Sequence, residues 1–119
     1  MKTAVKPIAS KTTQSIFRSK VQKIVAAIPE GKVATYGQVA ALAGAQGAAR
    51  AVGAVMRTNK DTRAVPCHRV VGVAGALTGY AYGYGTRTKK QMLEKEGVVF
   101  KGENVDLAKS LWKKGGRAV

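Results

Sequence analysis

Two short helical segments joined by a glycine restrict the fold of this chain more than any other feature of its sequence. Residues 37–43 carry apolar side chains at helical spacing and end at Gly44. A second pattern of the same kind runs over residues 46–58. Two short helices joined by a tight turn are typical of a helix-turn-helix, in which the second helix lies against DNA. We therefore expect a mainly α fold, a small helical bundle built around a helix-turn-helix.

Further helices are predicted on both sides of this pair. Apolar residues recur at three- and four-residue spacing from Ser15 to Ile28, with Ser15 as the candidate N-cap. Helices are also expected over residues 86–97, with Gly97 as C-cap, and over residues 106–114. Short apolar segments predict strands or extended chain at 32–36, 70–73 and 98–100. Glycines after the second of these segments predict a loop, so the fold is expected to be winged-helix-like with a short β and glycine-rich wing.

The length of the chain, 119 residues, fits one small domain. Residues 1–14 contain lysines without a periodic apolar pattern, which predicts a flexible basic arm. This arm is either a solvated tail or an auxiliary phosphate-binding segment. The expected division is an arm at 1–14, a single domain at 15–114 and a tail at 115–119.

The charge of the chain is strongly unbalanced, with 21 Lys and Arg residues against 6 Asp and Glu residues and a formal net charge of +15. Residues 31–93 hold nine of the positive residues and one acid, Asp61. Such an excess repels itself in a compact state and is compensated by a polyanion. Nucleic acid is the first candidate partner, and an anionic membrane surface or a ribosome-type assembly are the alternatives on charge alone. The segregation of the charge indicates a contiguous phosphate-facing surface.

Composition excludes several classes of protein. One cysteine allows no internal disulfide and no four-cysteine zinc site. The sequence has no run of about 18 apolar residues, so no membrane-spanning helix is expected. Residues 1–20 lack the apolar core of a secretory signal. We expect a reducing intracellular location, cytoplasmic or nucleoid-associated, where a lone thiol persists.

The only cysteine and the only histidine are adjacent, as Cys67 and His68. Neighbours in a strand point to opposite faces, so activation of the thiol by the imidazole would need a turn or a bridging water. A carboxylate orients the histidine in many such sites, and Glu96 is the candidate here. The alternatives are an inert buried thiol and a structural imidazole. One cysteine and one histidine are too few ligands for a metal site.

The second helix of the pair is poor in large side chains. Its small residues are Ala48, Ala49, Ala51, Gly53 and Ala54. Arg50 is the one long side chain among them. Small residues here either allow close packing of two helices or let the helix backbone approach the wall of a DNA groove.

Five segments stand in one order between residues 15 and 100: 28–37, 48–53, 57–59, 66–71 and 89–97. Together they resemble the O6-alkylguanine-DNA alkyltransferases, also called methylated-DNA–protein-cysteine methyltransferases. In that family they would be the entry to the helix-turn-helix, the recognition helix, the hinge asparagine segment, the active-site signature and the closing helix. The signature reads Pro-Cys-His-Arg-Val-Val in this chain.

The resemblance implies a role for each matching residue. Cys67 would accept the alkyl group irreversibly, and His68 would act on it through a water, oriented by Glu96. Asn59 would brace the turn that presents the cysteine. Because O6 of a paired guanine is out of reach inside the base stack, the base must be extruded, and Arg50 would fill the gap.

The resemblance also implies a DNA surface and a substrate pocket. Tyr36 would help rotate the phosphate of the extruded nucleotide, and the second helix would lie in the minor groove. The implied DNA contacts are Thr35, Tyr36, Gly37, Ala48, Ala49, Arg50, Ala51, Arg57 and Arg69. The implied pocket residues are Pro66, Val70, Tyr80, Tyr82 and Gly83. The glycine loop is longer than the family pattern, so the lid tyrosine matches either Tyr80 or Tyr82.

Two functions agree with these features. The first is repair of duplex DNA by irreversible transfer of the alkyl group of O6-alkylguanine to Cys67. The second is that of the alkyltransferase-like proteins, which bind such lesions and flag them for another pathway. Those relatives typically replace the cysteine, which is retained here. A general basic nucleic-acid-binding protein with an inert cysteine is a third interpretation.

The expected partner is double-stranded DNA containing alkylated guanine, bound by a monomer with no cofactor, no metal and no membrane contact. Family members of full length carry an N-terminal domain. We therefore expect this chain to be the DNA-binding and acceptor domain standing alone.

Overall fold

The structure, a computed structural model of the chain, describes residues 5–78 and 85–113, with side chains from residue 14 onward. The α-helices are α1 (Val5–Ala26), α2 (Tyr36–Leu42), α3 (Ala49–Arg57), α4 (Thr86–Lys95) and α5 (Leu107–Ser110). Two 3₁₀ turns are present, η1 (Cys67–Arg69) and η2 (Val73–Gly75). The strands are β1 (Ala34–Thr35), β2 (Val70–Val71), β3 (Phe100–Lys101) and β4 (Asn104–Val105). The prediction of a mainly helical fold with a small β portion is confirmed.

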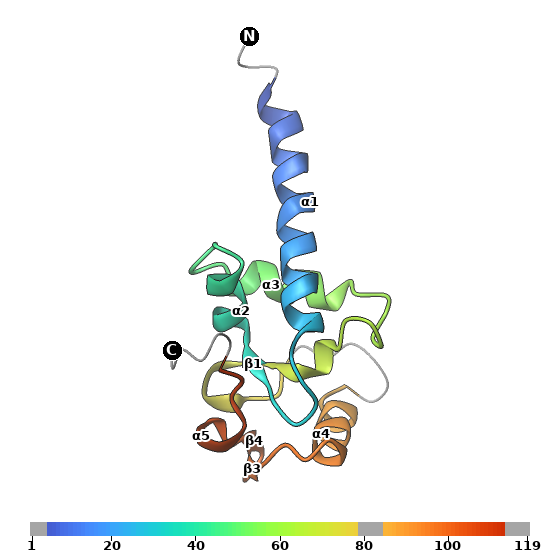
Figure 1. Cartoon of the computed structure of the whole chain (residues 1–119), viewed down its shortest axis with the longest axis vertical. Coiled ribbons are helices and arrows are strands. Elements are labelled where there is room, and N and C mark those ends of the chain that lie inside the picture. Colours follow the sequence, from blue (N-terminus) through green and yellow to red (C-terminus); the bar gives the residue numbers. More distant parts are fainter. Residues whose placement is uncertain (1–4, 79–84, 114–119) are drawn as a thin grey trace.

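Helix α1 begins ten residues earlier than expected. The sequence predicts irregular chain before Ser15, yet the helix starts at Val5, so Ser15 lies inside it and is not the N-cap. Pro7 falls in the first turn, where a missing N–H breaks no hydrogen bond, and no other helix breaker follows. The N-terminal half of α1 projects past the rest of the fold (Figure 1). This explains the missing apolar period, because that half has no core to face.

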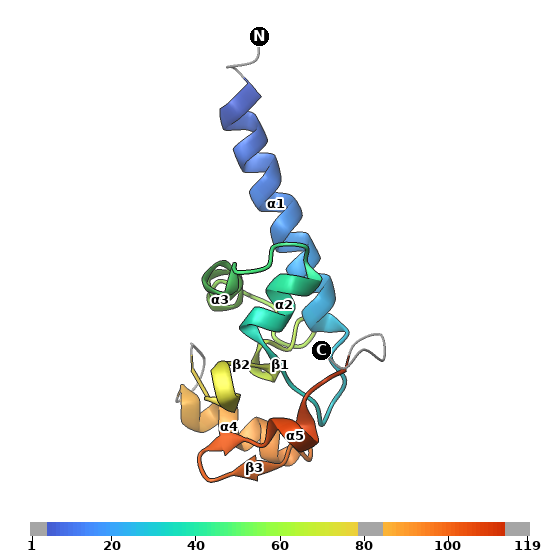
Figure 2. The ribbon, with the colours of Figure 1, turned by 90° about the vertical axis from the view of Figure 1, so that its left-hand side faces the viewer.

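The predicted helix-turn-helix is present as α2 and α3, which pack on each other and on α1 (Figure 2). A capping box starts α2: the Thr35 hydroxyl accepts from the Gln38 N–H at 3.0 Å, and the Gln38 side chain accepts from the Thr35 N–H at 3.3 Å. Gly44, at φ +81°, turns the chain after α2. Helix α3 is shorter than the expected 46–58, because Gly47 adopts φ +90° and lies outside the helical region.

The parallel strands β1 and β2 bring the start of the helix-turn-helix beside the segment that carries the cysteine, with Ala34 in register with Val70. Strand β2 ends two residues before the predicted strand does. The reason is a turn, in which the Gly72 N–H donates to the Ala76 carbonyl at 2.7 Å. Val73, expected in a buried strand, is therefore 87% exposed.

The C-terminal part of the chain also differs in detail from the prediction. Helix α4 is capped by Glu96, and Gly97 follows at φ +90°, one residue beyond the cap. Strands β3 and β4 form an antiparallel hairpin. Helix α5 ends at Ser110, after which the chain is extended and the Trp112 N–H donates to the Val33 carbonyl at 2.7 Å. Within residues 5–78 and 85–113, no helix has the length and apolar character needed to span a bilayer.

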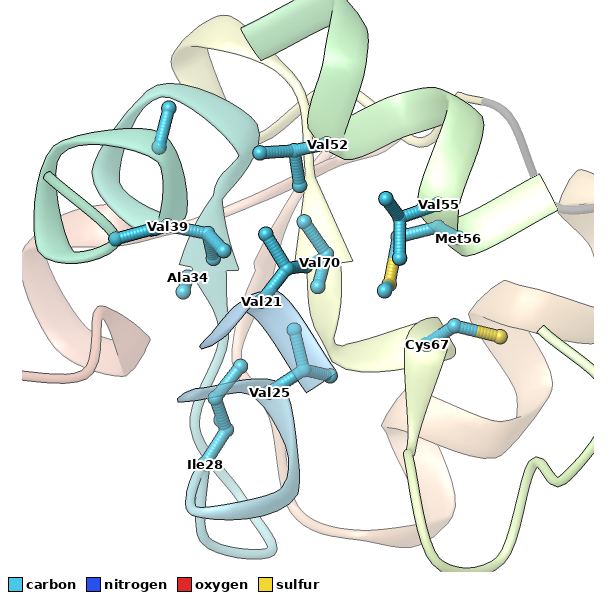
Figure 3. Packing of buried hydrophobic residues seen from close by; sticks show 12 residues of the cluster. Val21, Val25, Ile28, Ala34, Val39, Val52, Val55, Met56, Cys67 and Val70 are labelled. Atoms are coloured by element: carbon cyan, nitrogen blue, oxygen red, sulfur yellow. The ribbon is translucent and has the colours of Figure 1, made fainter. Parts of the chain in front are cut away.

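Two clusters of buried side chains meet at the β1–β2 pair. The first cluster joins α1, α2 and α3 and includes Ala34 and Val70, whereas Val33 and Val71 belong to the second, which packs against α4. Alternate strand residues thus face opposite clusters. Cys67 lies at the edge of the first cluster, with its sulfur directed away from the other labelled side chains (Figure 3). The cysteine is consequently placed at the junction of the two halves of the molecule.

Candidate active site

Cys67 and His68 lie in the turn η1 and not in a strand, which is one of the two arrangements expected if the imidazole activates the thiol. Each is only 4% exposed. Asn59 holds the segment before this turn, because its amide donates to the Val65 carbonyl at 2.8 Å and its side-chain oxygen accepts from the Asp61 N–H at 3.2 Å. These contacts agree with the bracing role that the resemblance implies for the asparagine.

A polar cluster lies behind the turn, and we call His68, Arg69 and Glu96 the Glu96 cluster. Glu96 Oε2 is 2.9 Å from His68 Nε2 and accepts from Arg69 Nη2 at 2.7 Å. Arg69 Nε donates to Glu96 Oε1 at 2.9 Å, and Arg69 Nη1 donates to the Ile28 carbonyl at 2.8 Å. Arg69, expected to contact DNA, is thus bound to acceptors within the protein, and a contact of this residue with DNA stays a prediction.

The pKa values of the Glu96 cluster favour a carboxylate beside a neutral imidazole. Burial lowers the pKa of His68 below 6.5, although its contact with Glu96 acts in the opposite direction. Burial alone would raise the pKa of Glu96, but hydrogen bonds from Arg69 and His68 outweigh it and leave that pKa lowered. With Glu96 charged at neutral pH, His68 Nε2 donates to the carboxylate. His68 Nδ1 is then the ring nitrogen able to accept a proton, and this buried atom has no hydrogen bond within the described residues.

Lys89, one of the nine positive residues between residues 31 and 93, is a buried cation. It is fully buried, its Nζ donates to the Thr78 carbonyl at 2.7 Å, and it lies 5.7 Å from the centre of the Tyr36 ring. Burial lowers the pKa of Lys89 to about 8, with an opposing electrostatic effect from Cys67. The signal in the sequence was its spacing of four residues from the buried Leu93 on one helix.

Tyr36 joins this buried lysine to the surface. Its hydroxyl donates to the same Thr78 carbonyl at 3.0 Å. Burial, together with the Cys67 sulfur, raises the pKa of Tyr36 above 10. Tyr36 and Lys89 are thus held by one acceptor and are both electrostatically coupled to Cys67.

A groove of about 800 Å³ opens on the surface next to Tyr36, between α3, the start of α2 and the turn η2. Six of the implied DNA contacts line it: Thr35, Tyr36, Gly37, Ala49, Arg50 and Arg57. Gly53 lines it as well, and the other side is formed by Gly72, Val73, Ala74 and Thr78. That second side was not expected from local patterns, because they assign Val73 to a buried strand.

The remaining implied residues lie elsewhere. Ala48 and Ala51 line a separate hollow of about 620 Å³ between α3 and α1. Pro66 is buried at the start of η1, and Val70 is fully buried in the first core cluster. Tyr80, Tyr82 and Gly83 fall outside the described residues. Within residues 5–78 and 85–113, no group of three His, Cys, Asp or Glu residues is placed to hold a metal ion.

Comparison with known proteins gives one family for most of the chain. Residues 16–98 match the family described as 6-O-methylguanine DNA methyltransferase, DNA binding domain. A methylated-DNA–protein-cysteine methyltransferase of Salmonella typhimurium is 48% identical over 83 residues, which are 70% of this chain and 47% of that protein. The chain thus spans about half the length of the curated methyltransferases that it matches.

Two further similarities cover most of the relative, and a third covers about half of it. A DNA base-flipping protein of Escherichia coli is 42% identical over 97 residues, which are 81% of this chain and 74% of that protein. The crystal structure of S. pombe Atl1 in complex with damaged DNA containing O6-carboxymethylguanine has a TM-score of 0.72 and 34% identity, covering 82% of this chain and 94% of that one. Mycobacterium tuberculosis OGT in complex with DNA has a TM-score of 0.62 and 44% identity, covering 68% and 49%.

Proposed function

Since the chain belongs to the family of 6-O-methylguanine DNA methyltransferase DNA-binding domains, we propose that it binds duplex DNA and transfers an alkyl group from O6 of an alkylated guanine to Cys67. The observation that supports this best is the position of the thiol. Cys67 is coupled to both Lys89 and Tyr36, and Tyr36 lines the groove on α3. Tyr36 therefore connects the groove with the buried Lys89, with which it shares the Thr78 carbonyl, and with the thiol.

The groove residues support entry of an extruded base. A guanine inside the stack cannot bring its O6 to a protein sulfur, so the nucleotide must rotate out of the duplex. Arg50 is exposed on the groove side of α3 and is long enough to occupy the vacated space, while Ala49 and Gly53 let the helix backbone approach the minor groove. One chain supplies all of these residues, so the proposal requires only a monomer.

The transfer itself is a single displacement. The Cys67 thiol loses its proton, the sulfur forms a bond to the alkyl carbon, and the carbon–oxygen bond to O6 breaks with its electron pair left on the guanine. The guanine then takes up one proton, so the net change is alkylation of the thiol and restoration of the base. His68 Nδ1, with Nε2 held by Glu96, is the acceptor for the thiol proton, directly or through a water. A protonated Lys89 and a Cys67 thiolate favour each other electrostatically.

The deciding experiment is mass spectrometry after incubation with a duplex containing O6-methylguanine. We expect the peptide that contains Cys67 to gain one methyl mass, and a Cys67→Ser variant to bind the duplex without any gain. An unmodified duplex is the matched control for the wild-type protein. Binding of the lesion by an equimolar amount of protein, without a mass gain, would contradict the transfer.

Recognition of the lesion without transfer is the second candidate function. The observation that favours it is coverage, because the chain matches 94% of the Atl1 chain but only about half of the methyltransferases. The same experiment separates the two functions. Recognition alone predicts preference for the duplex containing O6-methylguanine, an unchanged mass of the Cys67 peptide, and equal binding by the wild-type protein and the Cys67→Ser variant.

A further inference from the structure

The turn around η2 presents an apolar side chain to solvent. Val73 is 87% exposed, well above the other exposed large hydrophobic residues of the described part of the chain, Ile16 at 50% and Leu42 and Val99 at 40%. A valine in a turn gains nothing from the fold at this exposure. Single exposed apolar residues are common on protein surfaces, so the place of Val73 in the fold decides whether it has a role.

The turn is also held rigidly in an unfavourable conformation. Ala74 adopts φ +60°, in the left-handed region that favours glycine and asparagine. Its carbonyl accepts from the Asn104 side chain at 3.4 Å, and a Cβ at Gly75 would collide with the backbone of Val105. The hairpin thus fixes the turn from behind. Strain that the surroundings maintain is often found where a side chain must be presented to a ligand.

The position of the turn identifies what it faces. Val73 and Ala74 line one side of the groove, and Arg50 and Arg57 line the other on α3. In Figure 2 the yellow segment that contains the turn lies below α3, so the two sides belong to different parts of the fold. The described groove residues include no acid, which favours a polyanion as the occupant of the groove.

We propose that Val73 is an apolar wedge that contacts deoxyribose and base edges in the minor groove, opposite Arg50, and helps to keep the extruded nucleotide out of the stack. This proposal rests on the proposed binding of duplex DNA. An isopropyl group cannot bind a phosphate, but apolar side chains do separate base steps in proteins that bend DNA from the minor groove. The groove is then a two-sided clamp, cationic on α3 and apolar on the turn.

The test compares Val73→Ala and Val73→Lys with the matched control Val99→Ala, which removes the same methyl groups from an exposed valine on another surface. Affinity is measured for a duplex containing O6-methylguanine, together with the fluorescence of a 2-aminopurine placed beside the lesion, which reports unstacking. We expect Val73→Ala to weaken lesion binding about tenfold and to lower the fluorescence, since it loses about two buried methyl groups of contact. The dependence of affinity on salt should not change, because no phosphate contact is lost.

Val73→Lys separates a wedge from a merely electrostatic surface. A wedge predicts weaker lesion binding and less unstacking, whereas a phosphate-facing position predicts tighter binding and a steeper salt dependence. If both variants match the wild-type protein in affinity and fluorescence, the wedge is wrong while DNA binding stands. If the wild-type protein itself fails to bind the lesion duplex, the proposed function is wrong. Unchanged thermal unfolding of the variants shows that the fold is not the cause.

Discussion

The groove and the Glu96 cluster lie close together in the fold, but their arginines differ in whether acceptors within the protein compensate the positive charge. In the cluster, Arg69 is bound by Glu96 and by the Ile28 carbonyl, so its charge is compensated inside the protein. In the groove, Arg50 and Arg57 are exposed on α3, and no side-chain hydrogen bond or ion pair is found for either in the described part of the chain. Their charge is left for an external partner.

The same difference extends beyond charge. The groove side also contains the exposed Val73 and the strained Ala74. In the neighbouring Glu96 cluster, by contrast, the side chains are buried or partly buried and are hydrogen-bonded within the protein. Features that destabilise the free protein are therefore concentrated where DNA is proposed to bind. Charges that are compensated by hydrogen bonds within the protein are concentrated behind the nucleophile. An arginine is better assigned to a role by its acceptors than by its place in a basic stretch of sequence.

The largest expected effect on the free energy of unfolding comes from Glu96→Ala, which removes the carboxylate that compensates the charge of Arg69 inside the protein. This change leaves Arg69 and His68 without their carboxylate, although their side chains are only 16% and 5% exposed. Removing one partner of a buried ion pair lowers the free energy of unfolding by about 3–5 kcal/mol, which chemical denaturation measures. The control is Glu103→Ala, because Glu103 pairs with Lys90 while 88% exposed and should lose less than about 1 kcal/mol. Equal losses in the two variants would remove the distinction between the regions.

The contribution of Glu96 should depend on pH in a defined direction. Its pKa is lowered from 4.5 in the folded protein, chiefly by hydrogen bonds that overcome the effect of burial. A lowered carboxyl pKa stabilises the fold above the unfolded value and loses that contribution as the pH falls through the folded value. The difference between the wild-type protein and Glu96→Ala should therefore be full near neutral pH and shrink below about pH 4.5.

A second large effect is expected at Lys89, where stability and activity should move in opposite directions. Because its pKa falls from 10.5 to about 8 on folding, burial of the charge destabilises the fold at neutral pH. Lys89→Met should raise the free energy of unfolding by about 3 kcal/mol at pH 7. Below pH 8 the lysine is protonated in both states and the gain is complete. Between pH 8 and 10.5 only the folded state has lost the proton, so the gain should shrink as the pH rises.

The second measurement on Lys89→Met is its rate of methyl transfer in the proposed reaction. The cation is coupled to Cys67, so Lys89→Met should slow single-turnover transfer by at least about tenfold if a thiolate is the nucleophile. A variant that is more stable and transfers at the wild-type rate would mean that the buried charge does not assist the thiol.

Much of the fold followed from local sequence patterns. Glycine boundaries and apolar spacing predicted α2 and α3, and Gly97 predicted the end of α4 to within one residue. The start of α1 was missed because its first half projects past the rest of the fold (Figure 1). A helix with no core to pack against needs no regular spacing of apolar residues. The end of β2 was missed because a run of valines resembles a buried strand, whereas the turn closed by Gly72 exposes Val73.

The site was predictable where a residue is rare and much less so where only its burial distinguishes it. Cys67 and His68 are single occurrences, and Glu96 was named as the carboxylate that could orient the histidine, which it contacts. The resemblance supplied Asn59, which holds the segment before the turn. Lys89 is one of many lysines, and its spacing of four residues from Leu93 is the one local sign that it lies on the buried face of α4. The resemblance placed Arg69 among the DNA contacts, and local patterns do not show its acceptors within the protein, which lie 27 and 41 residues away in the chain.

Arg50→Ala tests most directly whether the charge in the groove serves an external partner. Because no internal partner is lost, the free energy of unfolding should change by less than about 0.5 kcal/mol. Binding of the lesion duplex should weaken about tenfold and transfer should slow, since the space left by the extruded base is no longer filled. Arg63→Ala is the control, because Arg63 is exposed but does not line the groove. A loss of stability at Arg50, or equal loss of binding at Arg63, would contradict the assignment.

The smallest expected effect concerns the strained turn and shows whether that strain serves binding. Ala74→Gly relieves the left-handed conformation at φ +60° but adds flexibility to the unfolded chain, so the free energy of unfolding should rise by about 0.5–1 kcal/mol. Ala76→Gly, at φ −65°, is the matched control and should lose a similar amount. If Ala74→Gly also weakens binding of the lesion duplex, the fixed turn presents Val73 in the bound conformation. If binding is unchanged, the strain is incidental to binding, and charge and the exposed Val73 are what distinguish the groove from the Glu96 cluster.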